Sequence, residues 1–321
     1  DLCPLLHRQM NTPRFLLISL SNIGDAVMTT PVLGALHAFE PRAIVDVVGD
    51  RRSSGIFTAC PYLGRLLHKD KRGALRGLPA LVADLRKVYY DLVVDLRTDF
   101  LPLLLRTRRR LYRWQGRAAG PHAVQQHLGV VAALGMETGA FLPQVWLRAA
   151  DHDFARTALG PFAGGRVLAL GPGANWPPKI WSGQNFVDLI ARMQAQFDAV
   201  VLLGSPADRA QAGTIAAASA LPCIDLVGAT GLLEAAAVLS RARAFVGNDS
   251  GLGHIAAAVR TPTLTLFGPG EPRRYHPWGV RAVWLAQPEG EIERLAVAEV
   301  STALATLLER HAETGQSAVG C

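Results

Sequence analysis

One stretch of sequence decides the fold: Phe245-Val246-Gly247-Asn248-Asp249-Ser250-Gly251-Leu252-Gly253-His254, followed by residues 255–259. An apolar strand ends in Gly-Asn-Asp-Ser-Gly, and a helix begins at once. Unpaired N–H groups and the positive end of the helix dipole therefore meet at Ser250 and Gly251, an arrangement that attracts anions. The neighbouring Asp249 carboxylate suits sugar or ribose hydroxyls. The loop thus has the parts to hold a nucleotide-linked sugar, and a plain helix cap beside a buried His254 is the alternative.

Apolar strands alternate with helical stretches on both sides of this loop, which is typical of parallel sheets in an α/β fold. The predicted strands are 15–20, 44–49, 92–96, 167–170, 200–203, 224–227, 244–246 and 263–267, and the predicted helices are 25–39, 78–88, 125–134, 185–196, 207–218, 232–240, 253–259 and 297–309. Glycine and proline in segment 160–165 predict a linker. We therefore expect two doubly wound domains, 1–160 and 161–321, with their chemistry in the loops that follow the strands.

The composition excludes several classes of protein. No apolar run in the 321 residues reaches the ~18 that a membrane helix needs, and the N-terminus lacks a signal-peptide pattern. The four cysteines show neither a CxxC pair nor a metal-ligand spacing. We expect a cytoplasmic, reduced protein with no metal site and no cofactor.

The net charge of +7 comes mostly from arginine, and basic residues gather in segment 106–117. The planar guanidinium group prefers phosphate and carboxylate partners. The segment could be a solvated surface loop, a site for an anionic acceptor or a membrane surface, or a nucleic-acid site. No helix-turn-helix, zinc-finger or RNA-recognition signature accompanies it, so we expect no nucleic-acid partner.

Two further strand-end loops carry unusual residues. In the loop 19–31, Gly24 allows a tight turn before Asp25, which stands at a helix start that should face the cleft between the domains. Asp25 is either an ordinary N-cap or a carboxylate base for a substrate hydroxyl. The loop 170–181 brings Gly171, Gly173 and Lys179 after another strand, but it is neither GxGxxG nor GxxxxGK[ST].

The glycines of that second loop let the backbone approach a ligand closely, and Lys179 is the only lysine in the second half of the chain. Its ammonium group could meet a diphosphate, or it could be an exposed lysine beside packed tryptophans. A shorter loop, 204–208, ends in Asp208, which is either a helix cap or a group that reaches a ribose.

Taken together, these loops resemble the ADP-heptose:lipopolysaccharide heptosyltransferases, glycosyltransferase family 9. The family's "LSxxGD…P" segment is similar to Leu20–Asp25 with Pro31, and its "pGa…K.W" segment is similar to Pro172–Ala174 with Lys179 and Trp181. Its "DTGxxHxAaA…P…lfGp" segment resembles 249–258 with Pro262 and 266–269, and Pro277-Trp278-Gly279 fits as well. The resemblance runs in order from about residue 14 to residue 310.

The resemblance implies a GT-B fold, in which two Rossmann-like domains face a central cleft. It implies inverting, metal-independent transfer of a heptose from a nucleotide donor to a lipopolysaccharide core or related acceptor. The family's catalytic aspartate falls on Asp25, and its donor-binding residues fall on Gly173, Ala174, Asn175, Lys179, Asp208, Asp249, Ser250, Gly251, Leu252 and His254. The acceptor should lie on the N-terminal domain, where Arg97, Arg108, Arg109, Arg110 and Arg113 could meet anionic core sugars. Such a glycolipid acceptor could bring the enzyme to the inner face of the inner membrane.

Three departures from the family pattern bear on the substrates. Ser250 replaces the usual threonine and keeps the hydroxyl, whereas Ala174 and Asn175 stand where hydroxyl residues are common, and Ser19 stands where many members have arginine. The reaction class is unaffected, but another donor, or a protein or other glycan acceptor, stays open. Rival classes are a GT-B nucleotide-sugar epimerase, a dinucleotide-dependent oxidoreductase and a catalytically silent sugar-binding protein.

Overall fold

The computed structural model describes residues 12–68, 77–287 and 289–316. These residues divide into two compact α/β units: the first takes in 12–22 and 29–141, and the second takes in 23–28 and the chain from 142 onward. The division falls before the predicted boundary at 160, because helix α4 (Ala149–Leu159) packs on helix α7 (Leu232–Arg241) of the second unit. The first turn of helix α1 (Ile23–Phe39) is also grouped with the second unit.

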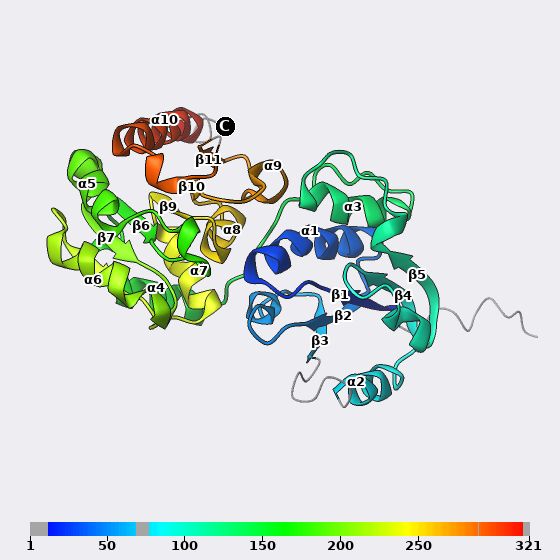
Figure 1. Cartoon of the computed structure of the whole chain (residues 1–321). Helices are drawn as coiled ribbons and strands as arrows, with labels where there is room; N and C mark the ends of the chain where they lie inside the picture. The colour runs from blue at the N-terminus through cyan, green and yellow to red at the C-terminus, as the bar shows by residue number, and fades with distance from the viewer. Residues whose placement is uncertain (1–11, 69–76, 288, 317–321) are drawn as a thin grey trace, which may run out of the picture. The chain divides into compact units, whose positions relative to one another are not determined.

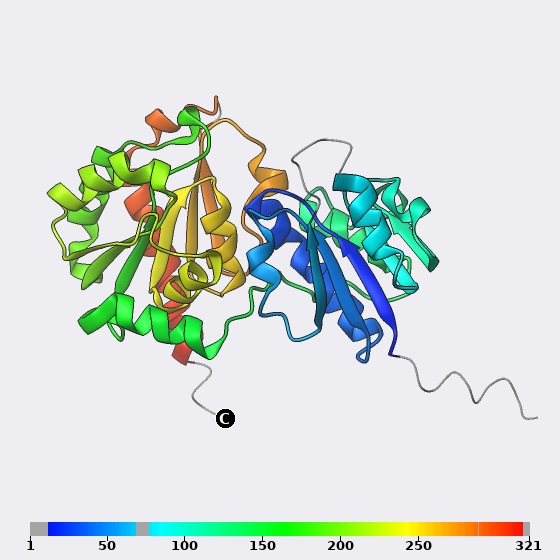
Figure 2. The same ribbon diagram turned by 90° about the horizontal axis from the view of Figure 1, so that it is seen from below.

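The first unit is built on a parallel sheet with the strand order β3-β2-β1-β4-β5. Its strands are β1 (Arg14–Ile18), β2 (Ile44–Gly49), β3 (Leu63–His68), β4 (Tyr90–Asp95) and β5 (Thr107–Tyr112), and its other helices are α2 (Gly77–Leu85) and α3 (Ala123–Ala132). In Figure 2 the blue strands β1 and β2 lie side by side. The central strands β1, β2 and β4 are mostly apolar because helices cover both faces of the sheet.

The second unit holds a six-stranded parallel sheet with the order β11-β10-β9-β6-β7-β8 (Figure 1). Its strands are β6 (Val167–Gly171), β7 (Ala199–Leu202), β8 (Cys223–Asp225), β9 (Ala244–Asn248), β10 (Thr263–Phe267) and β11 (Ala282–Ala286). Its remaining helices are α5 (Gly183–Met193), α6 (Arg209–Ala218), α8 (Gly251–Ala258), α9 (Pro272–Tyr275) and α10 (Val297–Gln316). Helices α5, α6 and α10 form one buried core with the sheet, and α4, α7 and α8 pack together elsewhere in the unit.

Two doubly wound parallel sheets confirm the predicted fold class, but two edge strands of the first sheet escaped prediction. Strand β3 lies in a stretch that the sequence presents as basic and glycine-punctuated, and β5 contains the arginines 108–110. Edge strands keep polar and charged side chains toward solvent, so they lack the continuous apolar run by which a buried strand is recognised. The basic segment 106–117 is therefore largely an edge strand and not a loop.

The strand order fixes where loops meet. Order reverses between β1 and β4 in the first sheet and between β6 and β9 in the second. Ligands of such sheets bind beyond the carboxyl ends of the strands at this reversal. In the second sheet the adjacent loops are those after β6 and after β9, the same two that the sequence singles out.

Among the described residues, no helix combines the length and hydropathy that a membrane span requires.

Candidate functional site

Helix α8 begins without a side-chain cap. Its N-cap residue, Ser250, has an extended backbone, and the Ser250 hydroxyl accepts no hydrogen bond from the first turn of the helix. The Oγ atom is buried and has no hydrogen-bond partner among the described residues. The first N–H groups of α8 are therefore left for a ligand, as an anion-binding helix start requires.

A cavity of about 660 Å³ opens beside this helix start. Its walls come from the loops after β6, β7 and β8, from the start of α7 and from the start of α8. The predicted donor-binding residues that line it are Gly173, Ala174, Asn175, Asp208, Ser250, Gly251 and Leu252. Residues that are far apart in the sequence thus surround one space at the carboxyl ends of the strands, which is the usual position of a ligand in this kind of sheet.

Asp208 is held against the glycine loop. Its Oδ2 atom accepts hydrogen bonds from the backbone N of Ser205 at 2.7 Å and from the Ser205 hydroxyl at 2.9 Å. A Cβ atom on residue 173 would overlap the Asp208 carboxylate, so any other residue there would force that side chain to move. Asp208 takes part in the capping box of its own turn and also lines the cavity; its contact with a ribose stays a prediction.

Lys179 and Asp249 form an ion pair with each other. The Lys179 ammonium lies 2.5 Å from Asp249 Oδ2, and the two side chains are 21% and 14% exposed. Lys179 ends a short 3₁₀ turn, Pro177–Lys179, and Asp249 follows β9 directly. The sequence assigns each a separate contact with the donor and does not predict the pairing. Neither residue is among those that line the 660 Å³ cavity.

Asn248 ties these loops together, and the sequence analysis gives it no role. Its Oδ1 atom accepts a hydrogen bond from the backbone N of Trp181 at 3.1 Å, and its Nδ2 atom donates to the carbonyl of Pro172 at 2.6 Å. Asn248 and Trp181 are both fully buried. The sequence does contain a signal for this role, because Asn248 is a polar residue at the end of an apolar strand, and buried side-chain amides usually bond to backbone groups.

His254 is the fourth residue of α8 and does not line the cavity. The side chain is 6% exposed, and burial together with the nearby His276 lowers its pKa to about 4. The imidazole is therefore neutral near pH 7, and its Nδ1 atom has no hydrogen-bond partner among the described residues. The alternative of a buried histidine fits this environment better than a charged phosphate ligand.

Asp25 is the third residue of α1, because the helix begins at Ile23 and Asn22 is its N-cap residue. The ordinary N-cap interpretation of Asp25 is therefore wrong. Its turn belongs to the second unit and packs on the start of α8: a Cβ on residue 251 would lie 2.7 Å from the Ile23 side chain. Ile23 also lines the cavity, so the turn that carries Asp25 borders the donor loops.

The five arginines predicted to bind an acceptor are spread along the first sheet. Arg97 follows β4, whereas Arg108 and Arg109 line a cavity of about 280 Å³ at the amino ends of β1, β4 and β5. Arg109 donates to the carbonyl of Ala133, and Arg110 donates to those of Pro102 and Leu105. Arg113 pairs with Asp99 at 2.6 Å. The structure does not bring these guanidinium groups together into one site.

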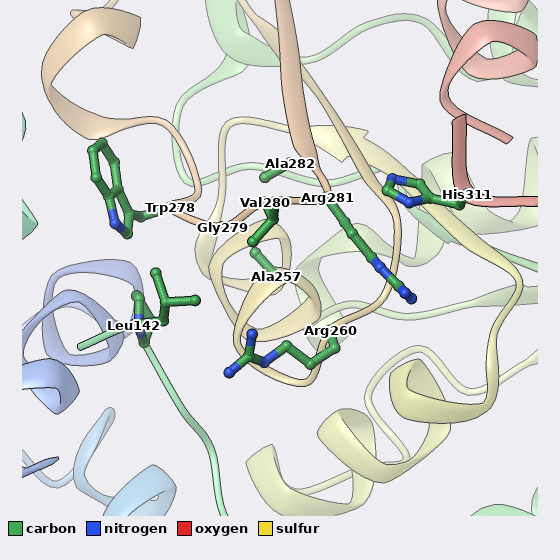
Figure 3. Close-up of a pocket in the computed structure, with 10 residues that line it drawn as sticks. Leu142, Ala257, Arg260, Trp278, Gly279, Val280, Arg281, Ala282 and His311 are labelled. Carbon is green, nitrogen blue, oxygen red and sulfur yellow. The ribbon is translucent and has the colours of Figure 1, made fainter. Parts of the chain in front are cut away.

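A further cavity of about 410 Å³ lies elsewhere in the second unit (Figure 3). Arg260, just after α8, and Arg281, just before β11, line it together with Trp278 and His311. Burial and the charges of Arg281 and Arg310 lower the pKa of His311. None of the residues singled out as donor- or acceptor-binding lies in this lining.

Comparison with known proteins decides the family. The family model of glycosyltransferase family 9 (heptosyltransferase) matches residues 79–299. The chain belongs to this family. Lipopolysaccharide heptosyltransferase 1 of Pseudomonas aeruginosa is 31% identical over 298 residues, which cover 81% of this chain and 79% of that protein.

Two solved structures show the fold of the family. The Escherichia coli ADP-heptose lipopolysaccharide heptosyltransferase II has a TM-score of 0.76 at 24% identity, covering 93% of this chain and 99% of that one. The Escherichia coli heptosyltransferase WaaC with ADP has a TM-score of 0.76 at 21% identity, covering 92% and 99%. This glycosyltransferase therefore has the predicted GT-B fold, and family membership favours a transferase over a dinucleotide-dependent oxidoreductase.

Proposed function

We propose that this family 9 enzyme transfers a heptose from a nucleotide-diphosphate donor, ADP-heptose, to a hydroxyl of a lipopolysaccharide core, with inversion and without a metal ion. The observation that carries the proposal is the 660 Å³ cavity, whose walls combine glycine loops with the uncapped start of α8. The relatives agree with it, since they include lipopolysaccharide heptosyltransferases and one structure with ADP.

In this proposal the diphosphate lies at the start of α8, near Ser250 and Gly251, where N–H groups and the helix dipole favour negative charge. The nucleoside occupies the cavity between the glycine loop and α7, within reach of Asp208. Lys179 serves the diphosphate and Asp249 serves the donor sugar, so donor binding rearranges their ion pair. His254 stays neutral and supports the first turn of α8 from below.

The transfer is a single displacement. Asp25 accepts the proton of the acceptor hydroxyl while that oxygen attacks the anomeric carbon of the heptose. The bond between the anomeric carbon and the diphosphate oxygen breaks at the same time, and its electron pair leaves with ADP. Lys179 and the N–H groups of α8 stabilise the negative charge that develops on the departing diphosphate, which is the part that a metal ion plays in other transferases.

Three of the five arginines predicted to bind the acceptor already have partners within the protein. Arg109 and Arg110 donate to backbone carbonyls, and Arg113 pairs with Asp99. The backbone N of Arg97 donates to Asp95 Oδ1, which fixes the residue at the carboxyl end of β4, beside the end of β1. Arg97 is therefore the first candidate for an anionic group of the acceptor.

Calorimetric titration with ADP tests the donor site. Gly173→Ala should displace the Asp208 carboxylate and reduce the affinity for ADP at least about tenfold, a difference of ~1.4 kcal/mol. Gly213→Ala is the matched control, because a Cβ at residue 213 meets no atom within 4 Å. Native protein that binds no ADP, or an equal loss in both variants, would overturn the placement of ADP in this cavity.

Mass spectrometry with a panel of nucleotide sugars then decides whether heptose or another sugar is transferred.

A further inference from the structure

Several large apolar side chains are exposed in the connection between β4 and β5 and just after β5. The exposed fractions are 50% for Phe100, 67% for Leu103, 44% for Leu104 and 67% for Trp114. The first three belong to or precede the 3₁₀ turn Leu101–Leu104, and Trp114 follows β5. Single exposed apolar residues are common on protein surfaces, but such a concentration within residues 100–114 marks a surface that meets an apolar partner.

These side chains are presented by a fixed segment. Arg110 donates to the carbonyls of Pro102 and Leu105, which fastens the turn to the middle of β5. Arg113 pairs with Asp99, which brings the beginning of the connection to the end of β5. Trp114 stacks on Tyr112 with ring centroids 5.4 Å apart. Phe100, Leu103, Leu104 and Trp114 therefore lie along one edge of the first sheet, and we call them the apolar edge.

The segment that carries the apolar edge is strongly basic. Segment 97–117 contains the arginines 97, 106, 108, 109, 110, 113 and 117 and a single acidic residue, Asp99. Asp99 is already paired with Arg113, and neither Arg106 nor Arg108 forms an ion pair within the described residues. Both arginines are exposed; Arg106 directly follows Leu105, and Arg108 follows two residues later. Long arginine side chains can keep their charged ends at the polar surface of an apolar phase while neighbouring apolar side chains enter that phase.

We propose that the apolar edge, together with Arg106 and Arg108, docks the protein on the surface of a bilayer that contains anionic lipids. Trp, Phe and Leu side chains flanked by arginines are the composition that enters the interfacial region, and anionic headgroups attract the arginines. A second copy of the chain fits less well. The arginines of edge strand β5 would face like charges across a symmetric contact, and they oppose strand pairing.

Sedimentation with lipid vesicles tests the proposal without donor or acceptor, so its failure is independent of the proposed sugar transfer. Native protein should bind phosphatidylglycerol–phosphatidylcholine vesicles at least about tenfold more tightly than phosphatidylcholine vesicles, and salt should reduce this difference. The variant Leu103→Ser/Leu104→Ser should weaken binding about tenfold, and Arg106→Gln/Arg108→Gln should remove the preference for anionic lipid.

Matched controls lie in the second unit. Val280→Ser removes another highly exposed apolar side chain, 83% exposed, and Arg192→Gln/Arg273→Gln removes two other exposed charges. Neither control should change vesicle binding. Equal losses in controls and test variants, or no binding by native protein, would overturn the proposal. A test variant that changes the oligomeric state and leaves vesicle binding intact would assign the edge to a second copy of the chain.

Fluorescence gives an independent measurement that does not depend on destabilising variants. Vesicles of brominated lipid should quench part of the tryptophan emission of the native protein. Trp114→Phe keeps an apolar ring, so the variant should still sediment with vesicles but should lose that quenched part. Undiminished quenching in Trp114→Phe would show that another surface meets the lipid and would contradict the proposed edge.

Discussion

At the scale of single residues, the pairing of Lys179 with Asp249 changes how the donor site is understood. The two charges neutralise each other in the described state, at 21% and 14% side-chain exposure. A diphosphate that binds to Lys179 must compete with a carboxylate already in contact, so part of the binding free energy is used to rearrange the pair.

Lys179→Ala should therefore weaken ADP binding and slow the transfer together. A charge-assisted contact contributes ~1.5–3 kcal/mol, which corresponds to about tenfold or more in affinity. The double variant Lys179→Ala/Asp249→Ala should recover part of that loss, because Lys179→Ala alone leaves the Asp249 carboxylate facing the diphosphate. Calorimetry with ADP measures both variants. Affinity that stays at the native value in Lys179→Ala would remove the lysine from the donor site.

At the scale of elements, the strand-end loops take their shape from a few buried polar groups. Asn248 holds the loop after β6 at Pro172 and the start of the next segment at Trp181. In the first unit, Asp46 on β2 plays a similar part: the fully buried carboxylate bonds to Arg14, Arg65 and Tyr90. Such groups stabilise a loop or strand only while all partners are present.

Asn248→Ala should lower the free energy of unfolding by ~1–3 kcal/mol, because two buried groups lose their partner. ADP affinity should fall as well at temperatures where the variant is folded, since the glycine loop is no longer tied to β9. Asn185→Ala on α5 is the control, because no hydrogen bond of the Asn185 side chain is present among the described residues. If the variant loses stability but keeps native ADP affinity, Asn248 is structural only.

Asp46 predicts a pH dependence of stability. Burial alone would raise its pKa, but hydrogen bonds from Arg65, Tyr90 and Arg14 outweigh burial and lower the pKa below its usual value. The unfolded pKa is about 3.9. The stabilisation is therefore fully present above that pH and is lost as pH falls through the lower folded pKa.

Urea unfolding from pH 6 to pH 3 measures this effect. The native protein should lose stability in the acid range more steeply than Asp46→Asn. At pH 6 the variant should be about 3–5 kcal/mol less stable than the native protein, because it breaks a buried ion pair. The exposed pair Asp153–Arg156 is the control, and Asp153→Asn should change stability by less than ~1 kcal/mol. Parallel pH curves for native protein and Asp46→Asn would assign the acid sensitivity to other groups.

The elements also show what sequence reasoning can and cannot recover. Strands β2 and β10 follow the predicted bounds, because buried parallel strands are apolar runs that turn residues delimit. Strands β3 and β5 were missed because their edge positions carry arginine and glycine. The grouping of Gly173, Asp208 and Ser250 around one cavity follows from strand order, whereas the Lys179–Asp249 pair and the Asn248 contacts depend on side-chain geometry that spacing does not contain.

At the scale of the whole molecule, each sheet has one order reversal, and the predicted chemistry follows the strands beside it. In the second unit these loops combine a helix start, glycines and one ammonium group. No group of three metal-ligating side chains is found in the parts of the chain that the structure describes. In the proposed mechanism, Lys179 and backbone N–H groups stabilise the charge on the leaving diphosphate.

Transfer should therefore continue in excess EDTA at close to the native rate. A magnesium- or manganese-bridged diphosphate needs carboxylate oxygens, and the Lys179 ammonium and α8 donors replace that arrangement in our account. The measurement is the initial rate of ADP release with and without chelator. Activity abolished by EDTA and restored by manganese would contradict the donor-site proposal.

The most direct test of the central claim is mass spectrometry of the product formed from ADP-heptose and a deacylated lipopolysaccharide core, with native enzyme and Asp25→Asn in parallel. Native enzyme should give an acceptor heavier by one heptose. Asp25→Asn should lower the rate about 10²–10⁴-fold, because the amide cannot accept the hydroxyl proton, while ADP affinity stays near native. An unmodified acceptor with native enzyme, or transfer by Asp25→Asn at the native rate, would contradict the proposed transfer.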